Sequence, residues 1–353
     1  MVKNSSEHTS CASFYNNRLS IAPMLDWTDR HFRFMMRLIC RHTLLYTEML
    51  ALEAVLRGDR EKLLSFSPCE SPLVLQIGGS DPFKMKQAAQ IAESFRYQGI
   101  NLNAGCPSDA VQKGGWGACL MKEPEKVADC VMALKDASSL PVSVKTRICL
   151  AGSEQPYEDM RRFAFLCARA GADGLIVHAR QAVLKKNFSP KDNRAKLPLD
   201  YAAVYQLKKE LKDTFPCLPV IINGNITFKD IKTHLPFADG VMIGRAAYGD
   251  PYSFAKADAV YYQDFHPVLS RADILRRMIE YACHQRPQKP LYITRHLMGL
   301  YKGTPLAGIF RKALMENSLK VLEDFLHQTD LTNKGKTPLN KANRTDVLSS
   351  DIS

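Results

Sequence analysis

Short apolar runs recur along the chain from Leu19 onward, and segments of helical length separate them. The runs are mostly continuous rather than alternating, which is typical of parallel strands buried on both faces. Eight such runs cover residues 19–24, 43–49, 73–79, 99–106, 141–148, 174–180, 219–226 and 240–247. Residues 82–97, 124–137 and 157–171 have the pattern of helices, and the first of these begins at a proline preceded by the capping residues Ser80 and Asp81.

Eight strands that alternate with helices over about 240 residues are typical of a (β/α)8 barrel. An open doubly wound sheet is the alternative, but no Gly-x-Gly-x-x-Gly turn follows the first strand. We therefore predict an α/β fold, a (β/α)8 TIM barrel over residues 18–258. The alternation stops after Pro251, and helical patterns at 271–286, 292–301 and 308–325 predict a small all-helical domain over 259–328. Residues 1–17 and 329–353 are polar and aperiodic, so we expect two tails, the second disordered.

The composition excludes several classes of protein. Of the 353 residues, 46% are hydrophobic and 24% are charged, which excludes disorder for most of the chain. No run approaches the roughly 18 apolar residues of a membrane-spanning helix. The first 17 residues lack the apolar segment of a secretory signal. Ten cysteines without a Cys-x-x-Cys pair or zinc-ligand spacing indicate a reducing compartment, the cytoplasm, and no metal site.

The charge balance favours a polyanionic partner. The formal net charge is +12, which suits a nucleic acid, a phosphate-rich ligand or an anionic membrane without choosing among them. Residues 180–199, which follow the sixth predicted strand, hold six Lys or Arg and one Asp, a net of +5. A run of like charges is usually a solvated surface. Beside a binding pocket, however, it would attract the sugar–phosphate backbone of RNA.

Polar and ionisable residues gather where the predicted strands end, and a barrel carries its chemistry at the carboxyl ends of its strands. After strands seven and eight stand Asn223, Gly224, Asn225, Gly244 and Arg245. This position is the usual phosphate site of such barrels, and backbone N–H groups with an arginine suit a phosphate. Glycines that merely serve tight turns are the alternative.

Three further residues at the strand ends suggest a flavin. Lys145 stands inside a predicted strand, where it must either face the barrel mouth or be paired, with Glu48 as the alternative partner. His178 ends the sixth strand, although a lone histidine is usually just a satisfied polar group. Gln76 can both donate to and accept from a ring with amide functions. A phosphate pocket with these groups favours flavin mononucleotide (FMN), since a cation near flavin N1 stabilises the reduced ring.

Cys106 is a candidate proton donor. Most of the cysteines lie in apolar runs and act as small hydrophobes. Cys106 instead lies in a Gly- and Pro-rich loop after the fourth strand. A thiol with an ordinary pKa near 8.5 is mostly protonated at neutral pH and can give up its proton. A nucleophilic pair with His178 is the alternative, but the sequence offers no oxyanion hole for it.

The chain resembles the tRNA-dihydrouridine synthases, and within them the bacterial A group, from about Leu19 to Phe325. The motifs that carry this resemblance occur in order along the chain. They are APMLDWTDRHFR (22–33), YTEM (46–49), LQIGGSDP (75–82), LNAGCPS (102–108), VQKGGWGACLM (111–121), VKTRI (144–148), IVHAR (176–180), SPKDNR (189–194), INGNI (222–226), IGRAAYGDP (243–251) and TRHLMGLYKG (294–303). The chain departs from the family pattern at Asn225 and at Gly308 and Ile309.

The resemblance implies an oxidoreductase that uses FMN and NADPH to reduce uridine to 5,6-dihydrouridine in the D-loop of tRNA, at positions 20 and 20a. Hydride would pass from flavin N5 to uracil C6, and Cys106 would protonate C5 as general acid. The implied FMN contacts are Pro23, Met24, Gln76, Lys145, His178, Asn223, Gly224, Asn225, Gly244 and Arg245. The implied tRNA contacts, toward D-loop and elbow, are Asn103, Lys191, Arg194 and Arg311. No obligate protein partner is evident.

Two other functions are compatible with parts of the sequence. An FMN barrel that acts on a free pyrimidine, such as dihydroorotate, accounts for the flavin and Cys106. It does not account for the basic loop, the helical domain or the overall charge. A non-catalytic RNA-binding module accounts for the charge but not for the polar strand ends.

Overall fold

The computed structural model describes residues 18–185 and 187–334. Eight parallel strands form a single sheet in the order β1-β8-β7-β6-β5-β4-β3-β2. The strands are β1 (Leu19–Ile21), β2 (Leu45–Ala51), β3 (Leu73–Gly78), β4 (Gly99–Asn103), β5 (Val142–Arg147), β6 (Gly174–His178), β7 (Val220–Asn223) and β8 (Gly240–Ile243). All eight predicted strands are present in order, and most of them end earlier than predicted because their last residues turn into the loops.

The sheet closes into a barrel between β1 and β2. Ile21 N donates to Leu44 O (2.9 Å), and Leu44 N donates to Leu19 O (3.0 Å). Ser20 and Leu44 form a parallel bridge at the same place. The predicted (β/α)8 barrel is therefore confirmed, and the open doubly wound sheet is excluded.

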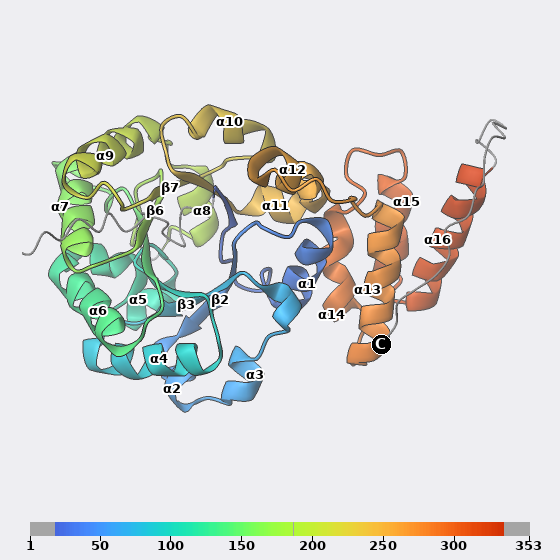
Figure 1. Cartoon of the computed structure of the whole chain (residues 1–353), viewed down its shortest axis with the longest axis horizontal. Helices are drawn as coiled ribbons and strands as arrows, with labels where there is room; N and C mark the ends of the chain where they lie inside the picture. The colour runs from blue at the N-terminus through green and yellow to red at the C-terminus, as the bar shows by residue number, and fades with distance from the viewer. Residues whose placement is uncertain (1–17, 186, 335–353) are drawn as a thin grey trace, which may run out of the picture.

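Helices surround the barrel (Figure 1). They are α1 (Arg30–Ile39), α2 (Leu52–Arg57), α3 (Arg60–Leu64), η2 (Pro68–Glu70), α4 (Pro82–Ser94), α5 (Asp109–Lys113), η3 (Gly117–Lys122), α6 (Pro124–Ala137), α7 (Pro156–Arg169), α8 (Pro190–Ala195), α9 (Tyr201–Thr214), η4 (Phe228–Asp230), α10 (Ile231–His234), α11 (Arg245–Gly249), η5 (Pro251–Lys256) and α12 (Ala257–Tyr262). As predicted, α4 begins at a proline, and Asp81 caps it by accepting from Lys84 N. The short helix α8 lies in the basic segment 180–199, where no helix was predicted.

The C-terminal helices lie together on one side of the barrel (Figure 1). They are α13 (Arg271–Gln285), α14 (Leu291–Thr294), η6 (Arg295–Gly299), α15 (Ala307–Met315) and α16 (Leu319–Lys334). The single helix predicted over 308–325 is wrong: Asn317 adopts a left-handed conformation (φ 52°) and separates α15 from α16. The side chain of Asn317 accepts from Leu291 N at 2.7 Å, which fixes this break against α14.

Three aromatic rings pack together in the helical domain, and they belong to the same continuous hydrophobic core as the barrel helices. The rings of Tyr301, Phe310 and Phe325 lie 4.5–5.3 Å apart, centroid to centroid. The predicted C-terminal tail begins at Thr329, yet α16 continues to Lys334. The rest of that tail and the N-terminal tail, residues 1–17, lie outside the described residues. In the described part of the chain, no helix is long and apolar enough to cross a membrane.

Side chains inside the barrel form layers. Alternate residues of a strand point to the same face, and seven inward-facing residues form an apolar cluster. They are Ala22, Leu44, Tyr46, Val74, Ile176, Ile221 and Met242. Two residues further along several strands, the inward-facing residues become polar. This change in polarity marks the mouth of the barrel.

Candidate active site

Polar side chains from five neighbouring strands converge above the apolar layer. Gln76 on β3 pairs in register with Asn101 on β4, and Asn103 pairs with Lys145 on β5. Arg147 pairs with His178 on β6, and His178 pairs with Asn223 on β7. The structure thus brings together Gln76, Asn103, Lys145, His178 and Asn223 at one end of the barrel, as the sequence predicts.

A buried hydrogen-bonded row forms the floor of this site. Gln76 Nε2 donates to Asn101 Oδ1 at 2.7 Å, and Asn101 Nδ2 donates to Ser143 Oγ at 2.8 Å. Asn103 Nδ2 donates to Gln76 Oε1 at 3.1 Å. Gln76, Asn101 and Ser143 are almost completely buried. Because these amides hold one another, the floor is rigid before any ligand binds.

Cys106 lies on a loop that β4 holds in place. Asn103 Oδ1 accepts from Gly105 N at 3.1 Å and from Cys106 N at 3.0 Å. Cys106 is a free, half-buried thiol, and its Sγ donates to Ser108 Oγ at 3.5 Å. Asn103 is itself buried. Its contacts therefore fix the Cys106 loop and turn the amide toward the pocket rather than toward the outer surface.

Trp116 covers the other side of this loop. A Cβ at Gly78 would come within 2.0 Å of Trp116 Cζ3, and one at Gly114 would come within 2.2 Å of Trp116 Nε1. The indole therefore lies directly against both glycines. Ala118 N donates to Cys106 O at 2.9 Å, so the segment after Trp116 is bonded back to the cysteine.

Arg147 is a site residue to which the sequence analysis assigned no role. Its Nε donates to Gly105 O at 3.0 Å, and its Nη1 donates to Gln181 O (2.9 Å) and Asn193 O (3.2 Å). One buried guanidinium thus joins the Cys106 loop, the end of β6 and helix α8. The available signal is the spacing in VKTR, where Arg147 follows Lys145 by two residues and so shares its inward face.

Lys145 is half-buried, and its only polar contact among the described residues is Asn223 Oδ1 at 3.4 Å. The alternative pairing with Glu48 is wrong, because Glu48 instead accepts from Asp26 N. Loss of hydration, followed by the charge of Arg147, lowers the pKa of Lys145 to about 8. The ammonium is therefore still mostly charged at neutral pH.

His178 is neutral at physiological pH. Burial lowers its pKa well below the usual value, and the charges of Arg147, Lys145, Arg180 and Arg245 lower it further. Its Nδ1 is buried and has no hydrogen-bond partner among the described residues. A buried polar atom without a partner is costly unless a ligand completes it. His178 is thus not the satisfied polar group of the alternative interpretation.

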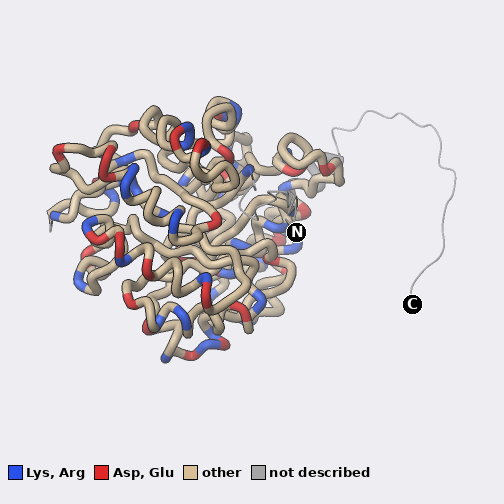
Figure 2. Tube along the Cα trace, turned by 60° about the vertical axis from the view of Figure 1, so that its left-hand side comes forward, with Lys and Arg blue, Asp and Glu red and all other residues tan. Residues whose placement is uncertain are grey.

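Five cations surround the mouth without acidic partners. Lys145, Arg147, Arg180, Arg194 and Arg245 form no salt bridge with any carboxylate in the part of the chain that the structure describes. Arg180 also keeps a buried Nη1 without a hydrogen-bond partner within the same residues. Figure 2 shows that elsewhere along the chain trace Lys and Arg positions are interspersed with Asp and Glu positions. This local excess fits an anionic ligand such as a phosphate.

The two predicted phosphate-site glycines differ. Gly224 has φ 131°, where a Cβ would be 3.0 Å from Leu199 Cδ2, so the turn itself requires glycine. Gly244 has no such need, because a Cβ there would meet only Ala22 Cβ at 3.5 Å and Met24 Sδ at 3.6 Å. The fold of the protein itself therefore does not require glycine at this position. Asn225 is exposed and left-handed (φ 52°), a conformation that asparagine tolerates.

The remaining predicted residues lie further out. Lys191 and Arg194 are exposed on α8, where Ser189 caps the helix by accepting from Asp192 N at 3.1 Å. Arg245 is exposed at the start of α11, and its Nη2 donates to Arg194 O at 3.5 Å. Pro23 and Met24 are half-buried after β1. Arg311 is exposed on α15, in the helical domain rather than at the strand ends.

The donor set as a whole suits a flavin mononucleotide. Gln76 offers an amide, Lys145 a cation and His178 an unsatisfied ring nitrogen, all inside the mouth. Arg245 stands beside Gly244, where a phosphate would lie against backbone and guanidinium. These groups could hold the ring and the phosphate at the same mouth.

Comparisons with known proteins point to one family. The family described as Dihydrouridine synthase (Dus) matches residues 20–334. A protein of Synechocystis named tRNA-dihydrouridine(20/20a) synthase is 48% identical over 306 residues, covering 86% of this chain and 90% of its own. The Escherichia coli protein of the same name is 43% identical over 320 residues, 88% of this chain and 89% of its own.

A solved structure, morphinone reductase, superposes with a TM-score of 0.49 at 12% identity, over 68% of this chain and 85% of its own. The family match covers more of the chain than this structural superposition does, because it spans both the barrel and the C-terminal helices. With relatives that are nearly half identical over almost their whole length, the chain belongs to the dihydrouridine synthase family.

Proposed function

We propose that this protein reduces uridine to 5,6-dihydrouridine in tRNA, at positions 20 and 20a of the D-loop. Relatives 43–48% identical carry the name tRNA-dihydrouridine(20/20a) synthase. The observation that carries the proposal is the Cys106 loop, which is held at a barrel mouth lined by cations that have no acidic partner among residues 18–185 and 187–334. A barrel that acts on a free pyrimidine is not favoured, because these relatives are named for tRNA.

FMN is the proposed cofactor, and NADPH is the proposed reductant. The residues that would hold FMN are Pro23, Met24, Gln76, Lys145, His178, Asn223, Gly224, Asn225, Gly244 and Arg245. When bound, the reduced flavin supplies a hydride equivalent to C6 of the uracil. Lys145 and His178 would complete hydrogen bonds to the ring, and Arg245 with the backbone at Gly244 would bind the phosphate.

Cys106 is the proposed general acid. Its Sγ–H gives a proton to C5 of the uracil, and the S–H bond electrons stay on sulfur as a thiolate. Lys145, Arg147 and Arg194 are close enough to Cys106 to interact with its charge. These cations would stabilise the thiolate that remains after the transfer. Asn103 and Arg147 hold the loop so that the thiol keeps one position.

The tRNA would be bound around this mouth and by the helical domain. A uracil in folded tRNA must leave its stack to reach a pocket inside a barrel. Asn103 would contact the extruded nucleotide, while Lys191 and Arg194 on α8 would contact backbone phosphates. Arg311 on α15 would extend the contact toward the elbow.

The test is reduction of tRNA that lacks dihydrouridine. Purified protein is incubated with NADPH and either an unmodified transcript or tRNA that carries its other modifications, and D-loop fragments are examined by mass spectrometry for a gain of two hydrogens. We expect the gain at positions 20 and 20a. NADPH consumption without any gain on either RNA would contradict the proposal.

The substitution Cys106→Ala tests proton donation separately from flavin binding. We expect flavin retention and loss of reduction by about 10²–10⁴-fold, the usual range for a general acid. Cys119→Ala is the matched control, because Cys119 is also a half-buried free thiol and lies just after the Cys106 loop. Normal turnover by Cys106→Ala would remove Cys106 as the proton donor.

A further inference from the structure

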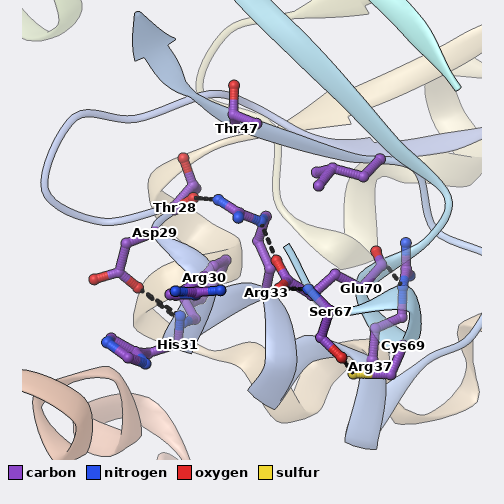
Figure 3. A network of polar contacts seen from close by, with 12 residues as sticks. Thr28, Asp29, Arg30, His31, Arg33, Arg37, Thr47, Ser67, Cys69 and Glu70 are labelled. Carbon is purple, nitrogen blue, oxygen red and sulfur yellow. Dashed lines mark hydrogen bonds and ion pairs between the residues drawn. The ribbon is translucent and has the colours of Figure 1, made fainter. Parts of the chain in front are cut away.

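Asp29 joins two distant parts of the chain through its two carboxylate oxygens. Oδ1 accepts from His31 N (2.9 Å) and Phe32 N (3.0 Å), which caps helix α1. Oδ2 accepts from Arg295 Nη2 (2.9 Å) and His296 Nε2 (3.0 Å) in η6. Figure 3 shows Asp29 and His31 at the start of α1. One side chain thus binds the loop after β1 on one side and the helical domain on the other.

The contact is shielded and charged. His296 is completely buried, and the Asp29 side chain is only 18% exposed. Burial on its own raises the pKa of Asp29, but the hydrogen bond and charge of His296, with the Phe32 N–H, lower this pKa well below its usual range. Asp29 is therefore ionised at any physiological pH. Because a carboxylate only accepts, His296 Nε2 carries the proton of their hydrogen bond.

Aromatic contacts extend from this carboxylate back to the barrel mouth. His296 Nδ1 lies 3.2 Å from Tyr248 Oη, and Tyr248 belongs to α11, three residues after Arg245. Trp27 stacks on Tyr248, with ring centroids 4.5 Å apart and 23° between the planes. Trp27 stands three residues after Met24, and Trp27 N donates to Met24 O at 3.0 Å. The cluster thus connects to both loops that are proposed to contact the flavin.

A second contact lies on the other side of the α1 N-terminus. His31 Nδ1 lies 2.9 Å from Tyr281 Oη on α13. Burial lowers the pKa of His31 to about 4, so its ring is neutral at physiological pH and this contact is not an ion pair. The start of α1 therefore meets the helical domain through one charged and one neutral hydrogen-bonded contact. Because there are two contacts, the helical domain cannot rotate freely about either one.

We propose that Asp29, with Arg295 and His296, is a positioning clamp that sets the helical domain against the barrel mouth, so that a uridine of bound tRNA reaches Cys106. This inference rests on the proposed function. The clamp residues touch neither the thiol nor the proposed flavin contacts directly. They act through the loop that holds Trp27 and Met24 and through α11. A misplacement of about 1 Å at a reacting centre can cost about 10²-fold in rate.

The two oxygens of Asp29 allow the clamp to be separated from the cap. In Asp29→Asn, the amide oxygen can still accept from His31 N and Phe32 N, as asparagine does at helix N-caps. The NH₂ group in place of Oδ2 cannot accept from Arg295 or His296. Arg295→Gln removes the ion pair from the other side and leaves the cap untouched. Arg162→Gln is the matched control, since it removes an Arg–carboxylate pair with Glu125 on the barrel wall.

The experiment follows the two half-reactions of the holoenzyme separately. Flavin reduction by NADPH is measured by absorbance in a stopped-flow instrument without tRNA. Reoxidation of the reduced enzyme by saturating tRNA is then measured in a single turnover. For Asp29→Asn and Arg295→Gln we expect the NADPH half-reaction within 2-fold of wild type and the tRNA half-reaction slower by about 10–100-fold. Arg162→Gln should leave both rates unchanged.

Binding and stability measurements complete the test. Flavin content should stay near that of wild type, and tRNA affinity should change less than the single-turnover rate does. The thermal midpoint should fall, because a partly buried ion pair is broken, but it should stay above the assay temperature. Because both substitutions break the same contact between Asp29 and Arg295, the double variant should be no slower than the worse single variant. Equal slowing of both half-reactions, or wild-type rates with tRNA in both variants, would overturn the clamp. Failure of the wild type to reduce tRNA would instead overturn the proposed function.

Discussion

The barrel mouth and the start of α1 both bury charged groups, but they treat them in opposite ways. At the mouth, Arg147 and Arg180 are 5% and 6% exposed, and within the described part of the chain their hydrogen-bond acceptors are all backbone carbonyls. At α1, Arg33 is 6% exposed and its Nε lies 2.7 Å from Glu70 Oε2 (Figure 3). These arginines are equally removed from water, so burial does not distinguish a structural charged group from a functional one in this molecule. The presence or absence of an oppositely charged partner distinguishes them.

This difference has a physical cause. Unpaired buried cations repel one another and lose hydration, so they raise the free energy of the unliganded protein. An anionic ligand removes that cost when it binds. Paired charges, in contrast, depend on each other for stability, and removal of one leaves the other buried and alone. The comparison therefore predicts that substitutions in the two regions affect stability in different directions.

Arg33→Met should have the largest effect on stability. It leaves the Glu70 carboxylate, which is 2% exposed, without its guanidinium. We expect a loss of about 3–5 kcal/mol in the free energy of unfolding, as for other broken buried pairs. Urea unfolding measures this loss, and Arg162→Gln provides the exposed comparison. A loss below 1 kcal/mol for Arg33→Met would show that pairing does not distinguish the two regions.

Charge reversal on α8 should weaken tRNA binding without affecting the fold. Lys191→Glu with Arg194→Glu removes two exposed cations from the segment beside the mouth. We expect binding weaker by about 10-fold or more and a salt dependence flatter by about one unit per lost phosphate contact. Filter binding over a range of salt concentrations measures both quantities. Lys209→Glu with Lys212→Glu on α9 is the control, and an identical salt slope in both double variants would exclude α8 as an RNA contact.

Lys145→Met should stabilise the flavin-free protein at neutral pH. Burial, then the charge of Arg147, lowers the pKa of Lys145 from 10.5 to about 8. Between these values the unfolded chain binds more protons at this site than the folded one, so its contribution to the free energy of unfolding rises with pH. We expect the variant to be more stable by about 1–2 kcal/mol at pH 7, after allowance for its partial exposure.

The pH dependence is the control for this prediction. The stability difference between wild type and Lys145→Met should shrink as pH rises from 8 toward 10.5, because Lys145 then loses its charge in the folded state while it stays protonated in the unfolded chain. Urea unfolding at pH 7 and pH 10 measures the difference. A variant that is less stable than wild type at pH 7 would indicate a partner for Lys145 in the unliganded protein.

The two glycines should respond differently to alanine, and Gly244 should show the smallest effect on stability. Gly224→Ala places a Cβ at φ 131°, so we expect it to cost about 1–3 kcal/mol in the free energy of unfolding. Gly244→Ala meets only ordinary contacts and should cost less than about 0.5 kcal/mol. Its effect should appear instead as weaker flavin retention after gel filtration. Full retention by Gly244→Ala would mean that no ligand approaches this backbone closely.

The sequence predicted the barrel well because continuous apolar runs are a local signal. The ends of the strands were predicted less accurately. Arg245, for example, was included in the eighth predicted strand and lies at the mouth, but it already belongs to helix α11. Helix α8 was missed although Ser189 and Asp192 form a capping box, because the flanking basic residues resemble a loop. Asn317 is of a residue type that can end a helix in the left-handed conformation, but the helical pattern continues on both sides of it and so hid the break.

The predicted site residues on β3 to β7 converge because strand periodicity fixes which side chains face inward. The role of Arg147 could not be predicted, since its acceptors Gly105, Gln181 and Asn193 lie 42, 34 and 46 residues away along the chain. The pairing of Asp29 with His296, 267 residues apart, depends equally on the tertiary fold. Only the packed structure reveals which carbonyl or carboxylate a distant side chain meets.

The stacking of Trp27 on Tyr248 has an optical consequence. The chain contains two tryptophans: Trp27, 38% exposed beside the helical domain, and Trp116, packed against Gly78 near the Cys106 loop. Each indole therefore lies at a different part of the proposed tRNA-binding region. In Trp116→Phe the remaining emission comes from the junction with the helical domain, and in Trp27→Phe it comes from the side of the Cys106 loop. The protein thus contains two native fluorophores that report separately on these two regions when RNA binds.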